Sequence, residues 1–479
     1  MVFTQGRGFV FGASFGLQVR SLRCRLLVCR AVDTASLAAW FLFGKLIGVA
    51  TLVGFGEKRC RKNLPLGDPS FPMREADSTQ PNVQPRRRWL SFSIRTLLVA
   101  MLIFASLFAW LGKHVIRTRA ERPVVAQIQA AGGNAYYDYQ LGFGFVNPAK
   151  TPVGSKLVRT MLGDDIYATV NVVSFYNPTT DANIKDLHKL ANLLDVSISG
   201  PGITDECIDD LLRINKFRSL NLSDTSITPE GLARLSASKT LQHLTLYGNT
   251  VTDAHLQTLP SFPNLQFLQI IRAPVTDSGI KPLGSIKQLR QLDIFTANAV
   301  TDAGIQQLAN LTNLEQLKLL QTAVTDDSLP TVSKMIALKT LQLDGHPLTH
   351  DGFRHLESLK QLEWLHLCDT KIDDNSLDVL SRLSNLKYLN IAGTLVSDDG
   401  LSHLIPLQSL ERLEIQRTSV TDSGLQQLAK LETMVSLGVE IENHITMDGV
   451  DALKTKLPNC VIKCWDLEPD GSGVLAETR

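Results

Sequence analysis

One phrase of 24 residues recurs eleven times without a gap between Ile203 and Leu453. Each copy reads Val/Ile-Thr-Asp-x-Gly-Leu-x-x-Leu, and the block Leu-x-x-Leu-x-Leu precedes it. Successive copies start 24 residues apart except for two steps of 25, and Thr180-Asp181 lies where a degenerate twelfth copy would begin the array. A fixed period of this length predicts a solenoid of stacked coils, because a single coil buries too little apolar surface to be stable alone. Such a fold offers a long surface rather than a pocket.

The repeat predicts one short strand and one helix in each coil. In the block Leu241-x-x-Leu244-x-Leu246 the last two leucines alternate with polar residues, which is the periodicity of a strand. Strands that all run in one direction form a parallel sheet. The Thr-Asp pair that follows is a favourable helix start, because threonine is a good N-cap and aspartate in the first turn suits the helix dipole. We therefore predict a right-handed α/β solenoid of about twelve repeats, with the parallel sheet concave and the helices convex.

A further column of mostly short polar residues lies two positions before the opening aliphatic residue of each copy. We expect these side chains to bond the backbone of the turn in the next coil, which would supply partners for buried turn amides. Ala273 and His346 interrupt the column. Its members are Thr225, Asn249, Ala273, Asn298, Thr322, His346, Thr370, Thr394, Thr418 and Asn443.

Charge is divided unevenly along the chain. Residues 1–122 hold 19 Lys and Arg against 6 Asp and Glu, whereas the remainder holds 29 against 41. An acidic solenoid is a poor nucleic-acid binder, which would need clustered positive charge, so no nucleic-acid partner is expected. The basic part lies beside hydrophobic sequence, which indicates a membrane.

Residues 94–112 are predicted to form a transmembrane helix. The stretch from Thr96 to Leu111 has sixteen residues without a charge, which is near the lower limit for crossing a hydrocarbon core of about 30 Å. Trp89 and Trp110 would lie at the two interfaces, where indole rings are favoured. Four basic residues flank each side, so the positive-inside rule gives no orientation. A buried core helix is the alternative.

Residues 1–72 leave three interpretations open. Leu37 to Phe55 is a second apolar stretch, interrupted by Lys45, and it is either another span or part of a long targeting segment. In the third interpretation Met73 is the true start. Residues 73–93 then form a basic polar linker before the span.

The remaining segments are predicted to close the solenoid. Residues 113–164 form a connector and N-terminal cap, with an amphipathic helix over 113–135 that Gly132-Gly133 stops and an edge strand at Tyr136–Tyr139. Such a cap is required because the first coil would otherwise expose its core. The solenoid covers 165–463, with a closing strand near 457–462, and residues 464–479 form a polar tail expected to be frayed.

No motif for catalysis or metal binding emerges. His346, His350 and His355 are close in sequence, but they occupy different structural columns of the repeat, so a common metal site is not expected. Cys460 and Cys464 would lie about 13 Å apart on a strand, beyond disulfide reach, and the seven cysteines are read as free structural thiols. We expect no enzyme, no cofactor and no small-molecule substrate.

The outward strand positions are the candidates for binding, because equivalent side chains of adjacent strands lie about 4.8 Å apart and form columns. One column carries four consecutive large apolar side chains, and aromatic residues recur in another. Exposed apolar patches and aromatic anchors mark interaction sites, although these side chains would also be explained by packing on one another. Lys318, with Asp293, Glu414 and Arg412, is expected to form a charged rim. The predicted protein-binding residues are Tyr247, Phe267, Ile271, Phe295, Lys318, Leu320, Trp364, His366 and Tyr388.

These repeats resemble the leucine-rich-repeat superfamily, closest to its ribonuclease-inhibitor-like and cysteine-containing subclass. The resemblance covers 165–463, is specific for fold, and implies protein–protein recognition without naming a ligand. The whole layout resembles bacterial membrane-anchored leucine-rich-repeat proteins, which implies a single-pass protein with a cytoplasmic N-terminus and an extracytoplasmic solenoid.

Three functions follow as hypotheses. The leading one is a membrane-anchored scaffold that binds a protein or peptide on the concave face. The second is a structural or self-associating envelope module without a discrete ligand. The third, a ubiquitin-ligase-type substrate adaptor, requires a ligase-docking motif before the repeats, and residues 113–165 show none.

Overall fold

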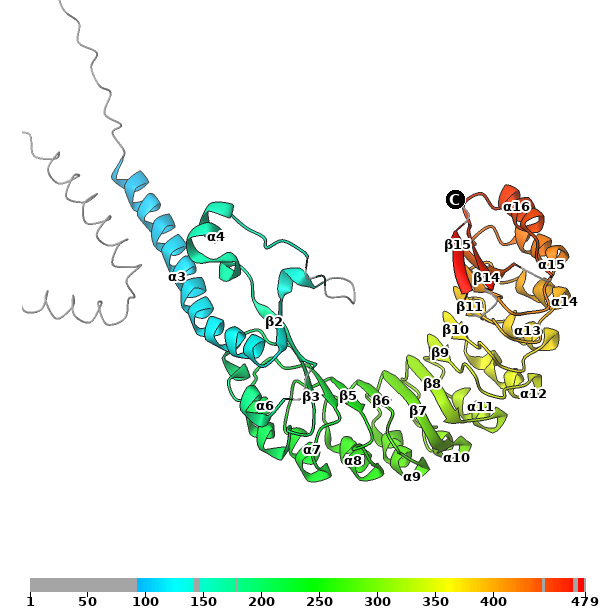
Figure 1. The fold of residues 1–479 in the computed structure, drawn as a ribbon, viewed down its shortest axis with the longest axis horizontal. Coiled ribbons are helices and arrows are strands. Elements are labelled where there is room, and N and C mark those ends of the chain that lie inside the picture. The colour runs from blue at the N-terminus through cyan, green and yellow to red at the C-terminus, as the bar shows by residue number, and fades with distance from the viewer. Residues whose placement is uncertain are drawn as a thin grey trace, which may run out of the picture. The chain divides into compact units, whose positions relative to one another are not determined.

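The computed structural model describes residues 93–141, 147, 149–176, 179–441, 444–467 and 473–477. The chain divides into two compact units, Met1–Lys113 and His114–Arg479. The described part of the first unit begins helix α3 (Ile94–Ala130), and the second unit holds the rest of that helix and the solenoid (Figure 1). The apolar stretch at 37–55, the whole segment 1–72 and residues 73–92 lie outside the described residues.

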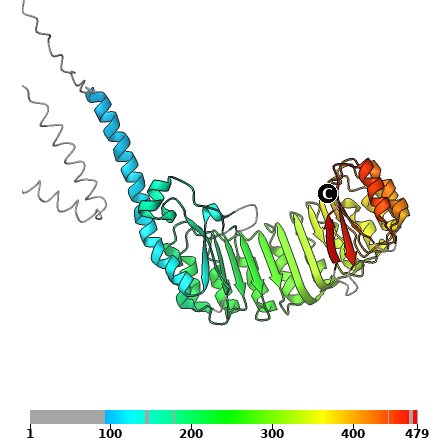
Figure 2. The same ribbon diagram turned by 45° about the horizontal axis from the view of Figure 1, so that its top comes forward.

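A single 15-stranded sheet runs through the second unit, and each strand pairs with its neighbours in chain order. Strands β2 to β14 are parallel, and β1 and β15 pair antiparallel at the two ends. Figure 2 shows the strands side by side along the concave face. The strands are β1 (Gly133–Tyr137), β2 (Val170–Phe175), β3 (Asp195–Ser199), β4 (Ser219–Ser223), β5 (His243–Tyr247), β6 (Phe267–Ile271), β7 (Gln291–Thr301), β8 (Gln316–Ala323), β9 (Thr340–Gln342), β10 (Trp364–His366), β11 (Tyr388–Asn390), β12 (Arg412–Glu414), β13 (Ser436–Glu440), β14 (Val461–Leu467) and β15 (Gly473–Glu477).

Each coil returns on the convex side through a short helix, as Figure 1 shows. Several of these helices begin or end in a 3₁₀ turn, because a coil of 24 residues leaves little length after its strand and turns. The helices are α4 (Lys156–Leu162), α5 (Asp181–Ile184), α6 (Ile208–Leu212), α7 (Pro229–Leu235), α8 (Asp253–Thr258), α9 (Asp277–Ile280), α10 (Asp302–Gln306), α11 (Leu329–Val332), α12 (His350–Phe353), α13 (Asp374–Leu380), α14 (Asp398–Leu401), α15 (Asp422–Gln427) and α16 (Met447–Lys456).

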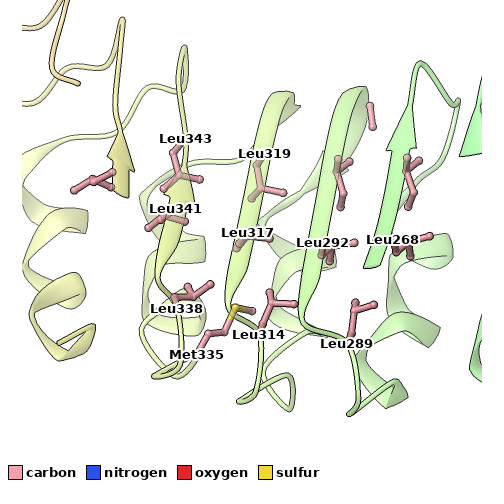
Figure 3. Close-up of a cluster of buried hydrophobic side chains, with 14 of the residues drawn as sticks. Leu268, Leu289, Leu292, Leu314, Leu317, Leu319, Met335, Leu338, Leu341 and Leu343 are labelled. Atoms are coloured by element: carbon pink, nitrogen blue, oxygen red, sulfur yellow. The ribbon is translucent and has the colours of Figure 1, made fainter. Parts of the chain in front are cut away.

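One continuous core fills the space between the sheet and the helices. Leu244, Leu268, Leu292 and Leu317 occupy the same position in four successive coils, and each is at most 1% exposed. Figure 3 shows the leucines of neighbouring coils stacked in rows beneath the strands. The expected interior of stacked coils is therefore confirmed.

The N-terminal end of the core is covered by the segment that precedes the first coil. Val124, Val125 and Ile128, on the last turns of α3, are buried in the same core as the solenoid leucines. The helix ends at Ala130, and Gly132 adopts a positive φ of 75°, which suits the reversal into β1. Strand β1 then pairs antiparallel with β2 as the predicted edge strand, but it begins at Gly133 and ends at Tyr137, and Asp138–Gln140 form a 3₁₀ turn.

The predicted span and the predicted amphipathic helix form one element, α3, rather than two. By length and composition, α3 is the one helix among the described residues that could cross a membrane. At the other end of the chain, part of the predicted frayed tail is ordered, because residues 473–477 form β15 against β14.

A ladder of aspartates joins each coil to the next. In nine coils the aspartate after the helix N-cap accepts two hydrogen bonds from the next coil, one from a backbone N–H and one from the hydroxyl of the threonine or serine there. The N–H bonds measure 2.7–2.9 Å and the hydroxyl bonds 2.6–2.7 Å. The aspartates are Asp181, Asp205, Asp253, Asp277, Asp302, Asp326, Asp374, Asp398 and Asp422. Threonine is the N-cap in most coils, as predicted. The aspartate not only suits the helix dipole but also links its coil to the next by hydrogen bonds.

The ladder explains the glycine of the repeated phrase. A Cβ atom on Gly304 would collide with Oδ1 of Asp277 in the preceding coil, and Gly279 stands in the same relation to Asp253. The same collision recurs at Gly231, Gly352, Gly400, Gly424 and Gly449. Glycine is therefore favoured by the neighbouring carboxylate rather than by a left-handed backbone. Cys207 and Ser328 are the small residues that take its place beside a ladder aspartate.

Where the preceding coil lacks the ladder aspartate, the residue in the glycine position accepts the backbone N–H of the N-cap residue instead. In the first coil, Oδ1 of Asn183 accepts the N–H of Thr180 at 3.0 Å. Where Pro229 replaces the aspartate, Nδ1 of His255 accepts the N–H of Thr252 at 3.1 Å. Where His350 replaces it, the hydroxyl of Ser376 accepts the N–H of Asp373 at 3.2 Å. In these three places, a coil without the ladder aspartate is followed by a coil without the glycine.

The predicted role of the polar turn column is wrong for three of its threonines. The hydroxyls of Thr370, Thr394 and Thr418 donate to the carbonyl oxygen three residues earlier in their own coil, at 2.6–2.8 Å, instead of reaching the next coil. A short hydroxyl side chain reaches its own turn more readily than one about 4.8 Å away. His346 does not interrupt the column, because its Nδ1 contacts the Leu343 carbonyl oxygen and its Nε2 the Thr322 hydroxyl.

His346 is expected to make the solenoid less stable in mild acid. Burial lowers the pKa of His346 below its ordinary value of 6.5. The unfolded chain therefore binds a proton at His346 more readily than the folded chain does. The contribution of neutral His346 to stability is present above pH 6.5 and falls as the pH drops below it. The free energy of chemical unfolding should differ between pH 7.5 and pH 5.5, and this difference should be smaller in the His346→Gln variant than in the natural chain. An unchanged difference would exclude His346 as a source.

Candidate functional site

The concave face presents three outward positions on each strand. On β6 they are Phe267, Gln269 and Ile271, and the direct register of neighbouring strands carries each position across the sheet as a column. The leucines between them point into the core. The predicted site residues all fall in these columns, and the structure brings most of them together in two groups, with Phe267 and Lys318 outside both.

The first group is the apolar stripe, which we define as Tyr247, Ile271, Phe295 and Leu320. These residues occupy the third outward position of β5 to β8 and are direct register partners. All four are half-buried, so lateral packing covers part of each side chain and leaves part open. Phe267 lies in the first column, where it stacks on His243 with ring centroids 3.9 Å apart.

The second group is the aromatic cluster, which we define as Trp364, His366 and Tyr388. The Trp364 and Tyr388 rings stack with centroids 5.1 Å apart, and His366 lies 4.6 Å from Tyr388. The Arg412 guanidinium lies 5.8 Å from the Trp364 centroid, a cation–π arrangement. Trp364 remains 37% exposed, so an apolar ring is presented to solvent.

Both titratable members of the aromatic cluster favour their neutral forms. Burial lowers the pKa of His366, with a smaller contribution in the same direction from Lys318. Burial raises the pKa of Tyr388 to about 12, and Glu414 and Asp344 add to this increase. The cluster is therefore an uncharged aromatic surface at neutral pH.

Lys318 and Asp293 occupy the second outward position of adjacent strands, between the two groups. Asp293 is 2% exposed, and its carboxylate accepts hydrogen bonds from the side-chain amides of Gln269, Gln291 and Gln316 at 2.8–3.4 Å. Asp293 is thus buried beneath glutamines and is not the rim charge that the sequence predicted. Lys318 itself is half-buried.

A ladder of alternating charges borders the columns and was missed in the sequence. The residues just before β7 to β12 alternate in sign, and their ion pairs include Arg290–Glu315 at 2.8 Å, Lys339–Glu315 at 2.7 Å and Lys387–Glu363 at 2.7 Å. The set is Arg290, Glu315, Lys339, Glu363, Lys387 and Glu411. Alternation at the repeat spacing would have revealed it. This border is electrically balanced, so it supplies no strong field of one sign.

The turn beside the apolar stripe has the conformation of the other coils. Arg272, Thr296 and Gln321 follow Ile271, Phe295 and Leu320, and all three have left-handed φ angles of 52–57°. The same position also has a positive φ at Asp224, Gly248, Gly345, Asp369, Gly393 and Arg417, so this backbone belongs to the repeat and does not single out the stripe.

The first 25-residue step of the array lies in the same place, between Val275 and Val300, and β7 reaches 11 residues there. Insertions in repeat proteins map to loops on one face, often the binding face. A shallow hollow of about 540 Å³ opens at these turns, lined by Asn249, Arg272, Ala273, Pro274, Val275, Thr296, Asn298 and Ala299.

The described residues contain no group of three or more His, Cys, Asp or Glu side chains placed to hold a metal ion. Among the described residues, Cys207, Cys368 and Cys460 are free thiols, as the sequence predicts for them. Burial, assisted by Asp181, raises the pKa of the Cys207 thiol to about 12, so this thiol is a packing group.

Comparison with known proteins bears on the fold. Residues 214–236 match a family model described as a leucine-rich repeat. Among solved structures, an internalin (inlF) from Listeria monocytogenes is 21% identical, with 61% of this chain and 86% of that chain covered and a TM-score of 0.45. An internalin C2 (inlC2) from the same organism is also 21% identical, with 44% and 84% covered and a TM-score of 0.34. No curated protein sequence matches the chain.

The finer expectation of a ribonuclease-inhibitor-like subclass is not supported. The matching model is a general one, and the helices from α5 to α15 are only four to seven residues long. The recurring phrase, the coil of one strand and one short helix that it builds, and the match at 214–236 together place the chain in the leucine-rich-repeat superfamily.

Proposed function

We propose that this protein is a membrane-anchored scaffold that binds a protein or peptide on the concave face of its solenoid. The observation that carries the proposal is the apolar stripe together with the aromatic cluster. Both present large apolar side chains in outward columns, where neither the leucine core nor the aspartate ladder requires them. Repeat architectures of this kind use their concave surfaces for binding.

The chemistry of the two groups suits a polypeptide partner. Aromatic rings with partly exposed faces are favoured anchors in protein interfaces, and Trp364 is 37% exposed. Hydrogen-bonding amides such as Gln342 and Asn390 lie in the column between them, and they can pair with peptide groups. A long and partly apolar surface fits an extended chain better than a compact small molecule.

Anchoring is assigned to the first part of α3. Residues 94–112 would cross the membrane, with the N-terminus in the cytoplasm and the solenoid outside. The apolar composition of this helix supports the assignment, and its exposed side chains include Leu102, Ile103 and Phe104. Protease accessibility of the solenoid in intact cells tests the orientation, because a cytoplasmic solenoid would be protected.

Replacing Phe295 and Trp364 with alanine is expected to abolish capture of the partner. Full-length protein, natural or variant, is used to capture proteins from envelope extracts, which are then identified by mass spectrometry. Ile336→Ala is the matched control, because Ile336 is 60% exposed and lies outside the strands. A partner recovered equally well by all variants would contradict the concave site. Capture of only the protein itself would favour the self-associating alternative.

A further inference from the structure

We propose that the partner segment is an extended peptide with an acidic side chain between two apolar anchors, and that this acid pairs with Lys318. The first anchor lies on the apolar stripe and the second on the aromatic cluster. This inference rests on the proposed function and specifies the chemistry of its ligand.

Lys318 has no counter-ion of its own. No hydrogen bond or ion pair of its ammonium group involves any residue that the structure describes. The acid beside it in the sheet, Asp293, is buried and accepts from three glutamine amides. The next acid, Asp344, accepts from the Cys368 N–H at 2.7 Å and from the Gln342 amide at 2.7 Å. Both nearby carboxylates are therefore engaged with amide donors.

A partner that covers the concave face must compensate for the water that it removes from the Lys318 ammonium group. Water solvates the ammonium group while the face is free, and an apolar partner surface would remove that water without compensation. A carboxylate placed on Lys318 would replace the lost solvation with a charge-assisted hydrogen bond. The lysine therefore favours an acidic residue at this point of the partner and disfavours a basic one.

The spacing of the anchors follows from sheet geometry. Phe295 and Trp364 lie three strands apart, or about 14 Å, and are offset by four residues along the strand, or about 13 Å. The two anchors are thus separated by about 19 Å, a distance that about six residues of extended chain would span. Lys318 lies between them, in the second column of β8. Alternate side chains of an extended chain face the sheet, so the acid must lie an even number of residues from both anchors, and Lys318 is nearer to Phe295 than to Trp364. The expected segment is an apolar residue, one spacer, Asp or Glu, three spacers and an aromatic or large aliphatic residue.

The surrounding charge limits the rest of the segment. The bordering ladder of Arg290 to Glu411 is internally paired, so it does not add to the attraction of Lys318. Residues 123–479 hold 29 basic against 41 acidic residues, so long acidic chains such as nucleic acids would be repelled. A single acid in an otherwise neutral segment satisfies both conditions.

Fluorescence polarisation with three matched peptides tests the proposal on the full-length protein in detergent. Each peptide carries Leu-Ser-X-Ser-Thr-Ser-Phe between Gly-Ser flanks, with Glu, Gln or Lys at X. We expect the Glu peptide to bind at least about tenfold more tightly than the Gln peptide, and the Lys peptide more weakly still. Lys318→Glu should reverse this order. Lys334→Glu, an equal charge change at an exposed position outside the strands, should preserve it.

The outcomes separate this inference from the proposed function. Equal binding of the Glu and Gln peptides, lost in Phe295→Ala, would overturn the role of Lys318 and leave the concave site standing. Failure of all three peptides would overturn the predicted segment, whereas partner capture by the natural chain and its loss in the alanine variants tests the concave site itself. A Lys318→Glu variant that still prefers the Glu peptide would also overturn the inference.

Discussion

Replacing Asp277 with alanine should destabilise the solenoid by on the order of 3 kcal/mol, and adding Gly304→Asn should recover much of that loss. Asp277 accepts the N–H of Thr301 at 2.7 Å and its hydroxyl at 2.7 Å. Without the carboxylate, both donors lose their acceptor at a half-buried junction between coils, and an unsatisfied donor costs about 1–3 kcal/mol. Asparagine at 304 can supply the acceptor from within the coil, as Asn183 does for Thr180.

The single Gly304→Asn variant is expected to be destabilised as well, since its Cβ would collide with Asp277. Two harmful changes that together do less harm than either alone would be the signature of a shared space. Unfolding midpoints report the stability, and hydrogen exchange at the Thr301 amide reports the junction, because a repeat array need not unfold in one step. Asp327→Ala is the control, as Asp327 is an exposed acid outside the ladder in the corresponding turn of a later coil. Additive losses in the double variant would contradict this interpretation.

The parts of the fold that could be predicted from the sequence are those that repeat within one coil. Leucine spacing identifies the strands and their buried faces, and Thr-Asp identifies the helix starts, because both depend on residues a few positions apart. The role of the aspartate was missed because its partner lies one full period away. A signal was present: Pro229 and His255 depart from the phrase in successive coils, as do His350 and Ser376.

The candidate site shows the same division. Register alone predicts that Tyr247, Ile271, Phe295 and Leu320 form a column, and the structure pairs them in that order. The burial of Asp293 could not be predicted in the same way, because it depends on three glutamine side chains from three different strands. Such contacts are set by side-chain packing rather than by the period of the chain.

The aspartate ladder also explains why the outward residues of the concave face can form a binding site. Adjacent coils are held together by buried leucines and by hydrogen bonds at the helix starts, both away from the outward strand positions. Substitutions at those positions therefore change the binding surface with little effect on stacking. Because stacking and the binding surface use different residues, function is expected at Phe295, Lys318 and Trp364 rather than in the recurring phrase of the repeat.

Replacing His255 with glycine should cost on the order of 3 kcal/mol, and adding Pro229→Asp should restore most of it. His255 is 8% exposed, its Nδ1 accepts from Thr252, and its Nε2 lies 3.0 Å from the Ile227 carbonyl oxygen. Glycine removes these bonds and leaves a cavity, which adds to the loss. An aspartate at 229 would enter that space and accept from Thr252, as Asp205 does from Thr228.

The double variant would thus convert an irregular junction into a regular one. Pro229→Asp alone should be destabilising, because its carboxylate would meet the His255 ring and because proline is favourable at the first position of α7. Comparing the unfolding midpoints of the natural chain, the two single variants and the double variant gives the coupling energy. A double variant no more stable than His255→Gly alone would show that the two departures from the repeat are independent, and the account of the ladder would then fail at this coil.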